Sequence, residues 1–342
     1  MKRLLLFSIA IILILCSCNY NRETRKKLVL ADTLLYQTKN DSAMKVLKSI
    51  NAEDLKDESD KAYYKLLTTQ AQLVLYQRPI PDSTLNECIK FYTKHYDAEK
   101  LAKAYYYNGA ILSKVRKIKK AIKLLKAGEV HAKKSKSLIL IHHIEEQLSI
   151  VNAKTGNFNT ALKYANTALQ HSKKLNRKSW IIEDMNRLAA IYDELGILDS
   201  SDYYITGALN YTKFLSKPLK ADFYANAGAY YYNSNKLDSA EKYILMSIKA
   251  KPTARANYIL GVIYMEKGRK AEAWKLCEKA AADGDFDIKA EVLAWMSDVK
   301  KEQGEYKEAM ELAERSKAAE DSMKARQQTE NMLALQEDIE KD

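Results

Sequence analysis

The fold is decided by the stretch from Tyr224 to Pro252, which reads YANAGAYYYNSNKLDSAEKYILMSIKAKP. Tyrosines stand four positions before and three positions after Gly228, and Ala240 stands twelve positions after it. Apolar and aromatic residues keep helical intervals on both sides of the polar NSNK segment, so two helices joined by a short turn are expected. The same Gly-to-Ala interval recurs at two further places, Gly109 with Ala121 and Gly261 with Ala273.

This pattern resembles the tetratricopeptide repeat, with Tyr224 in place of the first Trp, Ala227 in place of Leu and Ile244 in place of the later Phe. The resemblance implies an all-α fold, a right-handed superhelical solenoid of helical hairpins whose concave surface is lined mainly by the first helix of each pair. Small residues suit this fold, because a larger side chain at a close helix crossing costs about 1–3 kcal/mol through overpacking.

A small residue near the start of each second helix sets a common register for about eight hairpins. The register residues are Ala43, Thr84, Ala121, Ala161, Ser201, Ala240, Ala273 and Ala309. Five positions earlier stand residues that favour a left-handed helix end, namely Gly156, Gly196, Asn235, Gly268 and Gly304. Two positions before the register residue stand good N-cap residues, namely Asp41, Asp82, Asn159, Asp199 and Asp238. Together the two offsets predict a tight turn between paired helices.

The N-terminus is typical of a secretory signal peptide, with two basic residues, an apolar run from Leu4 to Leu15 and a short Cys-containing end. The run is about half the ~20 residues that a membrane-spanning helix needs. Residues 15–18, LCSC, resemble a bacterial lipobox, and Cys18 fits the acylated position better than Cys16 does. We therefore expect a signal peptide at 1–17, a lipidated tether at 18–24 and an exported, membrane-anchored protein facing the periplasm or the cell exterior.

The cysteine and charge content limit how the fold can be stabilised and which partners the protein can bind. Only Cys88 and Cys277 follow the lipobox, so a hydrophobic core and not a disulfide framework must hold the fold together. Both cysteines take equivalent inward positions on second helices and are expected to be buried packing residues. Removing Lys2 and Arg3 leaves 54 basic against 44 acidic residues, a balance that permits nucleic acid as a partner, but export argues against it.

The tetratricopeptide resemblance also predicts which side chains line the groove. Carrying its first-helix positions over by register gives Lys103, Tyr106, Tyr107, Lys114, His143, Glu146, Glu183, Asn186, Arg187, Asn226, Tyr232, Asn233, Tyr258 and Trp295. Aromatic and amide side chains of this kind suit an extended peptide or a helix. The alternative for each tyrosine is packing between neighbouring helices. Some members of the family clamp a terminal carboxylate with Lys and Asn residues, but here Tyr107 and Ala110 stand where Asn is needed.

Two charged segments lie outside this groove. The third repeat carries a basic block running from Lys114 to Lys136, with Glu129 as its local counter-charge. Such a block suits an acidic partner or anionic lipid, although a solvated face is the commoner explanation. From Glu302 onward twelve acidic residues stand against six basic ones. We therefore assign the repeats to residues 25–317 and a C-terminal acidic helix to residues 318–342.

No motif for catalysis or cofactor binding is present: the sequence lacks GxSxG, GxGxxG, a Walker loop and Cys-x-x-Cys. The segment HHIEE places His142 and Glu146 one helical turn apart, but two side chains are too few to hold a metal ion. We expect no enzyme, no cofactor and no metal.

The sequence leaves two functions open. One is a non-catalytic scaffold of the bacterial cell envelope that binds a protein or peptide. The other is the sensory part of a membrane-spanning transcriptional regulator or kinase, because the chain looks similar to periplasmic tetratricopeptide regions of regulators common in Bacteroidetes. An apolar stretch of ~20 residues encoded beyond Asp342 would favour the second.

Overall fold

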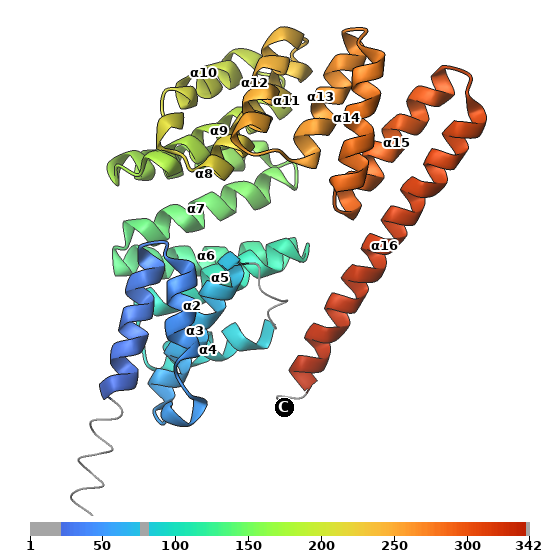
Figure 1. Ribbon diagram of the computed structural model, residues 1–342. Helices are drawn as coiled ribbons and strands as arrows, with labels where there is room; N and C mark the ends of the chain where they lie inside the picture. Colours follow the sequence, from blue (N-terminus) through green and yellow to red (C-terminus); the bar gives the residue numbers. More distant parts are fainter. Residues whose placement is uncertain (1–21, 76–81, 340–342) are drawn as a thin grey trace, which may run out of the picture. The chain divides into compact units, whose positions relative to one another are not determined.

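The computed structural model describes residues 22–75 and 82–339, and all regular structure within these ranges is helical (Figure 1). The chain forms two compact units, one built mainly from the residues up to Lys154 and the other from Thr155 to Met332. The signal peptide, the lipobox and Cys18 lie outside the described residues. Among the described helices, none combines the length and the apolar character that crossing a membrane requires.

The first unit contains a helix at residues 22–36 followed by six labelled helices. These are α2 (Asn40–Lys48), α3 (Glu58–Leu75), α4 (Asp82–Lys94), α5 (Ala98–Lys114), α6 (Ile118–Ser135) and α7 (Leu138–Ala153). The second unit contains α8 (Phe158–Lys174), α9 (Lys178–Glu194), α10 (Leu198–Leu209), α11 (Lys217–Asn233), α12 (Leu237–Ala250), α13 (Ala254–Glu266), α14 (Lys270–Asp283), α15 (Phe286–Glu302) and α16 (Tyr306–Ile339).

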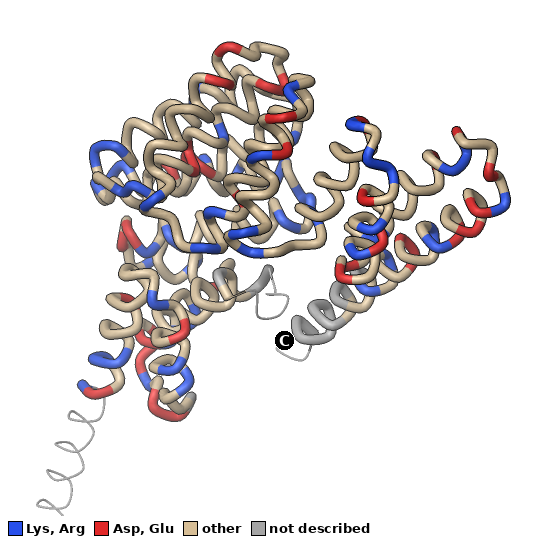
Figure 2. Tube along the Cα trace, turned by 45° about the horizontal axis from the view of Figure 1, so that its top comes forward, with Lys and Arg blue, Asp and Glu red and all other residues tan. Residues whose placement is uncertain are grey.

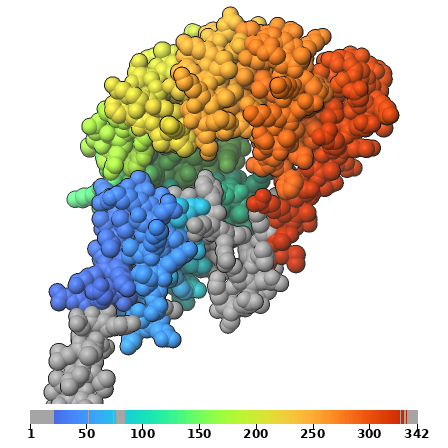
Figure 3. Space-filling view, viewed as in Figure 1, coloured from blue at the N-terminus to red at the C-terminus, as the bar shows by residue number. Residues whose placement is uncertain are grey.

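These helices follow one another as the predicted hairpins, and paired helices such as α5 and α6, or α11 and α12, pack against each other. The boundary between the units falls in the turn of the fourth hairpin. In the space-filling view, side chains fill the space between the ribbons of α11 to α13 (Figure 3). Helix α16 runs without a break through residue 318, so the acidic tail continues the second helix of the last hairpin.

The turns inside the hairpins adopt the predicted left-handed conformation. The φ angles are 74° at Gly156, 70° at Gly196, 56° at Asn235, 78° at Gly268 and 80° at Gly304. Thr38 and Arg116 take the same conformation at the equivalent place, with φ of 59° and 60°, although their side chains make it less favourable. The turn geometry is therefore common to hairpins with and without a glycine.

The hydrogen bonds of these turns explain why the predicted N-caps are wrong. At Gly196 the amide bonds to the carbonyl of Asp193, and the amide of Ile197 bonds to the carbonyl of Tyr192, which is the Schellman arrangement. Ile197 then serves directly as the N-cap of α10, so the turn leaves no place for a further capping residue.

The same pair of hydrogen bonds recurs in the turns at Thr38, Arg116, Asn235, Gly268 and Gly304. N-caps such as Lys39, Lys236 and Arg269 make no side-chain cap hydrogen bond. The predicted capping residues Asp41, Asp82, Asn159, Asp199 and Asp238 lie in the first turns of their helices instead. Carboxylates at this place still interact favourably with the unpaired N–H groups of the helix start. Among the described residues, side-chain caps do occur before four first helices, from Asp57, Asp97, Thr253 and Asp285.

The register residues are buried at the crossings of the paired helices, with the exception of Thr84, which is partly exposed beside the fully buried Leu85. At Gly228 an added Cβ would lie 2.5 Å from Cδ1 of Ile244 and 3.2 Å from the Ile244 amide nitrogen. At Gly261 it would lie 2.5 Å from Sγ of Cys277. The crossings are therefore as close as the Gly-to-Ala interval predicted.

The two predicted packing cysteines, Cys88 and Cys277, are indeed buried and free of disulfides. Burial raises the pKa of each thiol to about 12, so neither is a reactive thiolate near neutral pH.

We expect Gly228→Ala to destabilise the protein by about 1–3 kcal/mol, because the new methyl group meets both the side chain and the backbone of Ile244. The matched control is Gly207→Ala in the same unit, where the added Cβ meets only the terminal methyl of Met185. That change should be neutral or stabilise by up to about 1 kcal/mol through helix propensity. Urea unfolding followed by circular dichroism measures both, and equal effects would contradict the close crossing at Gly228.

Candidate binding faces

Successive first helices contact each other in both units. In the first unit α5 contacts α3 and α7, and in the second unit α11 contacts α9 and α13, while α13 also contacts α15. Each unit therefore has a layer of first helices, the layer from which the sequence predicted a groove.

Basic and acidic positions are interspersed along α15 and α16, so these helices do not present a single charge sign (Figure 2).

In the first unit the predicted residues Tyr106, His143 and Glu146 come together on α5 and α7. The ring of Tyr106 stacks on His143 with centroids 5.9 Å apart, and Nδ1 of His143 lies 3.6 Å from Oε2 of Glu146. Lys103 forms an ion pair of 3.1 Å with Asp32 of the helix at residues 22–36. The charge of Lys103 is therefore already compensated inside the protein.

Asp32 is a member of this face that the sequence analysis missed. Its carboxylate accepts a hydrogen bond of 2.6 Å from the hydroxyl of Tyr63 in addition to the Lys103 contact. The two bonds join the helix at residues 22–36 to α3 and α5. Because the partners stand 31 and 71 positions away, no local sequence pattern indicates them.

The structure corrects the prediction for Tyr107. Its side chain is 9 % exposed and lies in a core cluster with Leu85, Tyr92 and Leu101. Burial raises the pKa of the Tyr107 hydroxyl well above its ordinary value. Tyr107 therefore packs between helices and does not face the groove. Lys114 ends α5 and is exposed.

In the second unit the predicted residues connect neighbouring first helices. The hydroxyl of Tyr232 on α11 donates to Glu266 of α13, and Asn233 Nδ2 lies 3.5 Å from Oδ2 of Asp193 on α9. Tyr258 of α13 meets Trp295 of α15 edge to face, with ring centroids 6.1 Å apart. The half-buried rings of Tyr232, Tyr258 and Trp295 and the exposed Asn233 connect the helices of this layer, and part of each ring stays accessible.

The amide and basic positions differ in exposure. Asn226 is exposed, whereas Glu183, Asn186 and Arg187 are half-buried on α9. Arg187 donates a hydrogen bond of 2.9 Å to Asp184, a carboxylate with no exposed surface. Arg187 thus compensates a buried charge.

The basic block of the third repeat is partly compensated too. Lys126 and Lys133 each bind Glu129, at 2.6 and 2.7 Å. Burial alone would raise the pKa of Glu129, but the hydrogen bonds from both ammonium groups lower it. Lys119, Lys120 and Lys123 are exposed on α6.

A further cavity of about 590 Å³ lies between α14, α15 and α16, and no motif in the sequence pointed to it. Its lining includes Trp274, Leu293, Met296, Glu308 and Arg315. The lining combines apolar residues with groups of both charge signs, so it does not select one class of ligand.

Comparison with known proteins shows the fold. No family model and no curated protein sequence matches this chain. A Rap protein complexed with competence and sporulation factor is similar in structure, with a TM-score of 0.63 and 17 % identity over 89 % of this chain and 99 % of its own.

NprR in complex with its cognate peptide NprX gives a TM-score of 0.61 and 19 % identity over 85 % of this chain and 88 % of its own. The tetratricopeptide-repeat sensor protein PH0952 from Pyrococcus horikoshii, a signal transduction ATPase, gives 0.59 and 16 % over 82 % of this chain and 45 % of its own. The chain therefore has the fold of tetratricopeptide-like helical repeats.

The ionisation of Tyr258 gives a test of its half-buried position. Burial, aided by the negative charge of Glu291, raises its pKa from 10 to about 12. In the unfolded chain Tyr258 loses its proton near pH 10, whereas the folded protein retains it to about pH 12. The stability that this tyrosine contributes is therefore complete below pH 10 and is lost as the pH rises from 10 to 12.

We expect the free energy of unfolding to fall less between about pH 9 and about pH 11 in Tyr258→Phe than in the wild type, because Phe has no proton to lose. Urea titrations at the two pH values measure the difference. Equal losses in both proteins would show that Tyr258 ionises as freely in the folded chain as in the unfolded one.

Proposed function

We propose that this protein is a non-catalytic scaffold that binds an extended peptide or a protein segment on the first-helix layer of its second unit. The observation that carries the proposal is the row of half-buried aromatic and exposed amide side chains across α11, α13 and α15. Tyr232, Tyr258 and Trp295 are held in place by contacts between helices, and Asn226 is exposed on α11.

This arrangement suits a peptide for two physical reasons. Aromatic rings fixed by their neighbours lose little conformational entropy on binding and supply a large contact area. An exposed amide offers both a donor and an acceptor, which can match the backbone of an extended ligand. Some charged groups of the layer, by contrast, are paired within the protein, as Arg187 and Asp184 are.

The comparisons support the proposal at the level of the fold. NprR is described in complex with its cognate peptide NprX, and a Rap protein in complex with competence and sporulation factor. Both have the same kind of helical-repeat fold as this chain. The same fold thus presents surfaces that bind such ligands in other proteins.

The proposal is tested with a peptide selected from a random library displayed on phage. Tyr258→Ala should weaken binding of that peptide about 30-fold or more, because truncating an aromatic anchor typically costs about 2 kcal/mol. Asn226→Ala should weaken it about fivefold through one lost hydrogen bond. Tyr203→Ala is the matched control, because this tyrosine is 70 % exposed on the second helix α10 of the same unit.

Circular dichroism melts establish that each variant is folded before affinity is compared. Loss of binding on changing Lys119 and Lys120 to Ala, with no effect of Tyr258→Ala, would place the site on the basic surface of α6 instead. Failure of the library to yield any saturable peptide ligand would also contradict the proposal.

The proposed location is the cell envelope, with a lipid anchor on Cys18. Support comes from the signal peptide and the lipobox-like residues before Cys18. Several acyl chains hold a protein stably at a membrane, where a single chain does not.

We expect Cys18→Ala to move the protein from the membrane fraction to the soluble fraction. A high-salt wash is the necessary control, since it removes attraction between the basic block and anionic lipid. Retention of the variant in washed membranes would contradict the lipid anchor.

The second candidate is the sensory region of a membrane-spanning regulator. It is favoured by the likeness to PH0952, in which the repeats are described as a sensor within a larger protein. An apolar stretch of ~20 residues encoded directly after Asp342 would support this function over a free-standing scaffold.

A further inference from the structure

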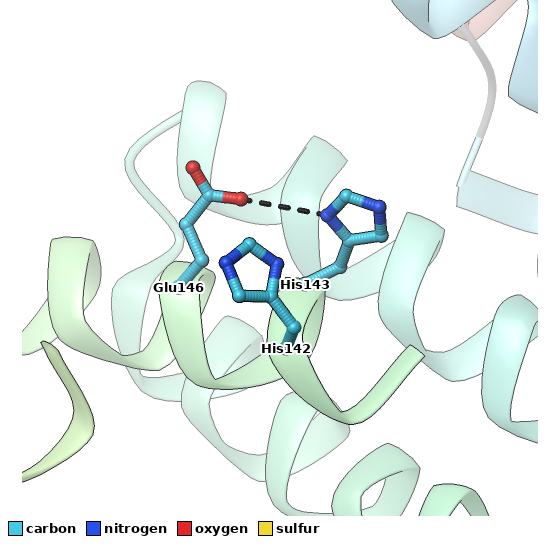
Figure 4. A group of neighbouring side chains, drawn as sticks. All are labelled: His142, His143 and Glu146. Atoms are coloured by element: carbon cyan, nitrogen blue, oxygen red, sulfur yellow. Dashed lines mark ion pairs between the residues drawn. The ribbon is translucent and has the colours of Figure 1, made fainter. Parts of the chain in front are cut away.

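The segment HHIEE on α7 brings three possible metal ligands together. One ligand atom from each of His142, His143 and Glu146 lies within 4.8 Å of the other two (Figure 4). The sequence analysis counted only His142 and Glu146, which stand one turn apart. The structure adds His143, whose ring turns towards Glu146 across the same turn of the helix.

The spacing of the His143 and Glu146 ligand atoms is close to what a metal ion requires. Zinc binds imidazole nitrogen and carboxylate oxygen at about 2.0–2.2 Å, so ligand atoms in a tetrahedral site stand roughly 3.3 Å apart. Nδ1 of His143 and Oε2 of Glu146 are 3.6 Å apart. Both side chains are partly exposed, at 30 % and 18 %, so small rotations can bring their atoms to a shared ion.

The surroundings orient the two histidines. His142 is 2 % exposed, so its imidazole is enclosed by protein. The ring of Tyr106 on α5 stacks on His143 with an interplanar angle of 25°, which restricts the orientation of that imidazole. Ligands held in this way lose little conformational freedom when a metal binds.

We propose that His142, His143 and Glu146 bind one divalent transition-metal ion, with Zn²⁺ as the ion that best fits the ligands. Two imidazole nitrogens and one carboxylate oxygen form a set that zinc accepts together with a water in the fourth position. The partial exposure of His143 and Glu146 leaves room for that water. This site does not depend on the proposed peptide binding.

The rest of the chain offers few competitors for such an ion. The protein has five histidines in all, and two of them belong to this cluster. Cys88 and Cys277 are buried with their thiol pKa values raised to about 12, so they do not supply thiolates. One metal ion per chain is therefore a meaningful stoichiometry to measure.

The test is isothermal titration of Zn²⁺ alone into the full chain, purified in detergent without a polyhistidine tag. We expect one saturable site, and at least about a tenfold loss of affinity in His143→Gln and in Glu146→Gln. Both positions are partly exposed, so the variants should keep the wild-type circular dichroism melt in the absence of metal. His95→Gln is the matched control, because His95 is exposed on the same unit and lies outside the cluster.

Replacing Zn²⁺ by Co²⁺ identifies the ligand type. Imidazole and carboxylate ligands give visible ligand-field bands without the intense sulfur-to-metal absorption that thiolates cause, which separates this cluster from the lipobox cysteines. Unchanged affinity in both cluster variants, a thiolate-type Co²⁺ spectrum, or the absence of a saturable site would overturn the proposal.

Discussion

The close crossing of paired helices is the constraint on which the rest of this structure depends. At Gly109, Gly228 and Gly261 a single added carbon would lie within 2.7 Å of a buried side chain from the partner helix. A backbone atom of the partner helix also lies within 3.3 Å of each added carbon, so a side chain at these sites would force the two helices apart in a densely packed interior. A wider hairpin would also separate its first helix from the next, and the layer of first helices in each unit would lose its contacts.

The turn geometry serves the same constraint. The Schellman hydrogen bonds end one helix and the following residue begins the next, so the two axes are joined by very few residues. Hairpins with Thr38 or Arg116 in the left-handed position show that the geometry is imposed by the packing, because these residues gain nothing locally from it. Glycine at the equivalent places adopts the left-handed conformation without the steric cost that other residues have, but it is not what produces the turn.

These features explain which parts of the molecule the sequence could predict. Glycine intervals and left-handed residues are local signals, so the hairpins, their register and most turns followed from them. The N-caps could not be predicted in this way. Asp and Asn favour the N-cap position, but their presence does not show that the Schellman turn already supplies the N-cap residue.

Tyr106 and Tyr107 illustrate a second limit. They are neighbours on one helix, so their side chains point about 100° apart, and a small error in register exchanges the exposed ring for the buried one. The partners of Asp32 are distant in sequence, and the orientation of His143 towards Glu146 depends on side-chain torsions. Neither can be predicted from the spacing of residues in the sequence.

The distribution of charge within the layers bears on what they can recognise. Asp184 has no exposed surface and holds Arg187, while Asp32 holds both Lys103 and Tyr63. Removing Arg187 would leave the buried carboxylate of Asp184 without this partner, which costs more than a surface ion pair contributes. The Asp32 contacts join the helix at residues 22–36 to α3 and α5, whereas the pair of Arg187 and Asp184 lies within α9. For the proposed peptide site of the second unit, aromatic contact and neutral hydrogen bonds are therefore the interactions we expect to carry recognition, and the fixed rings of Tyr258 and Trp295 and the exposed amide of Asn226 suit them.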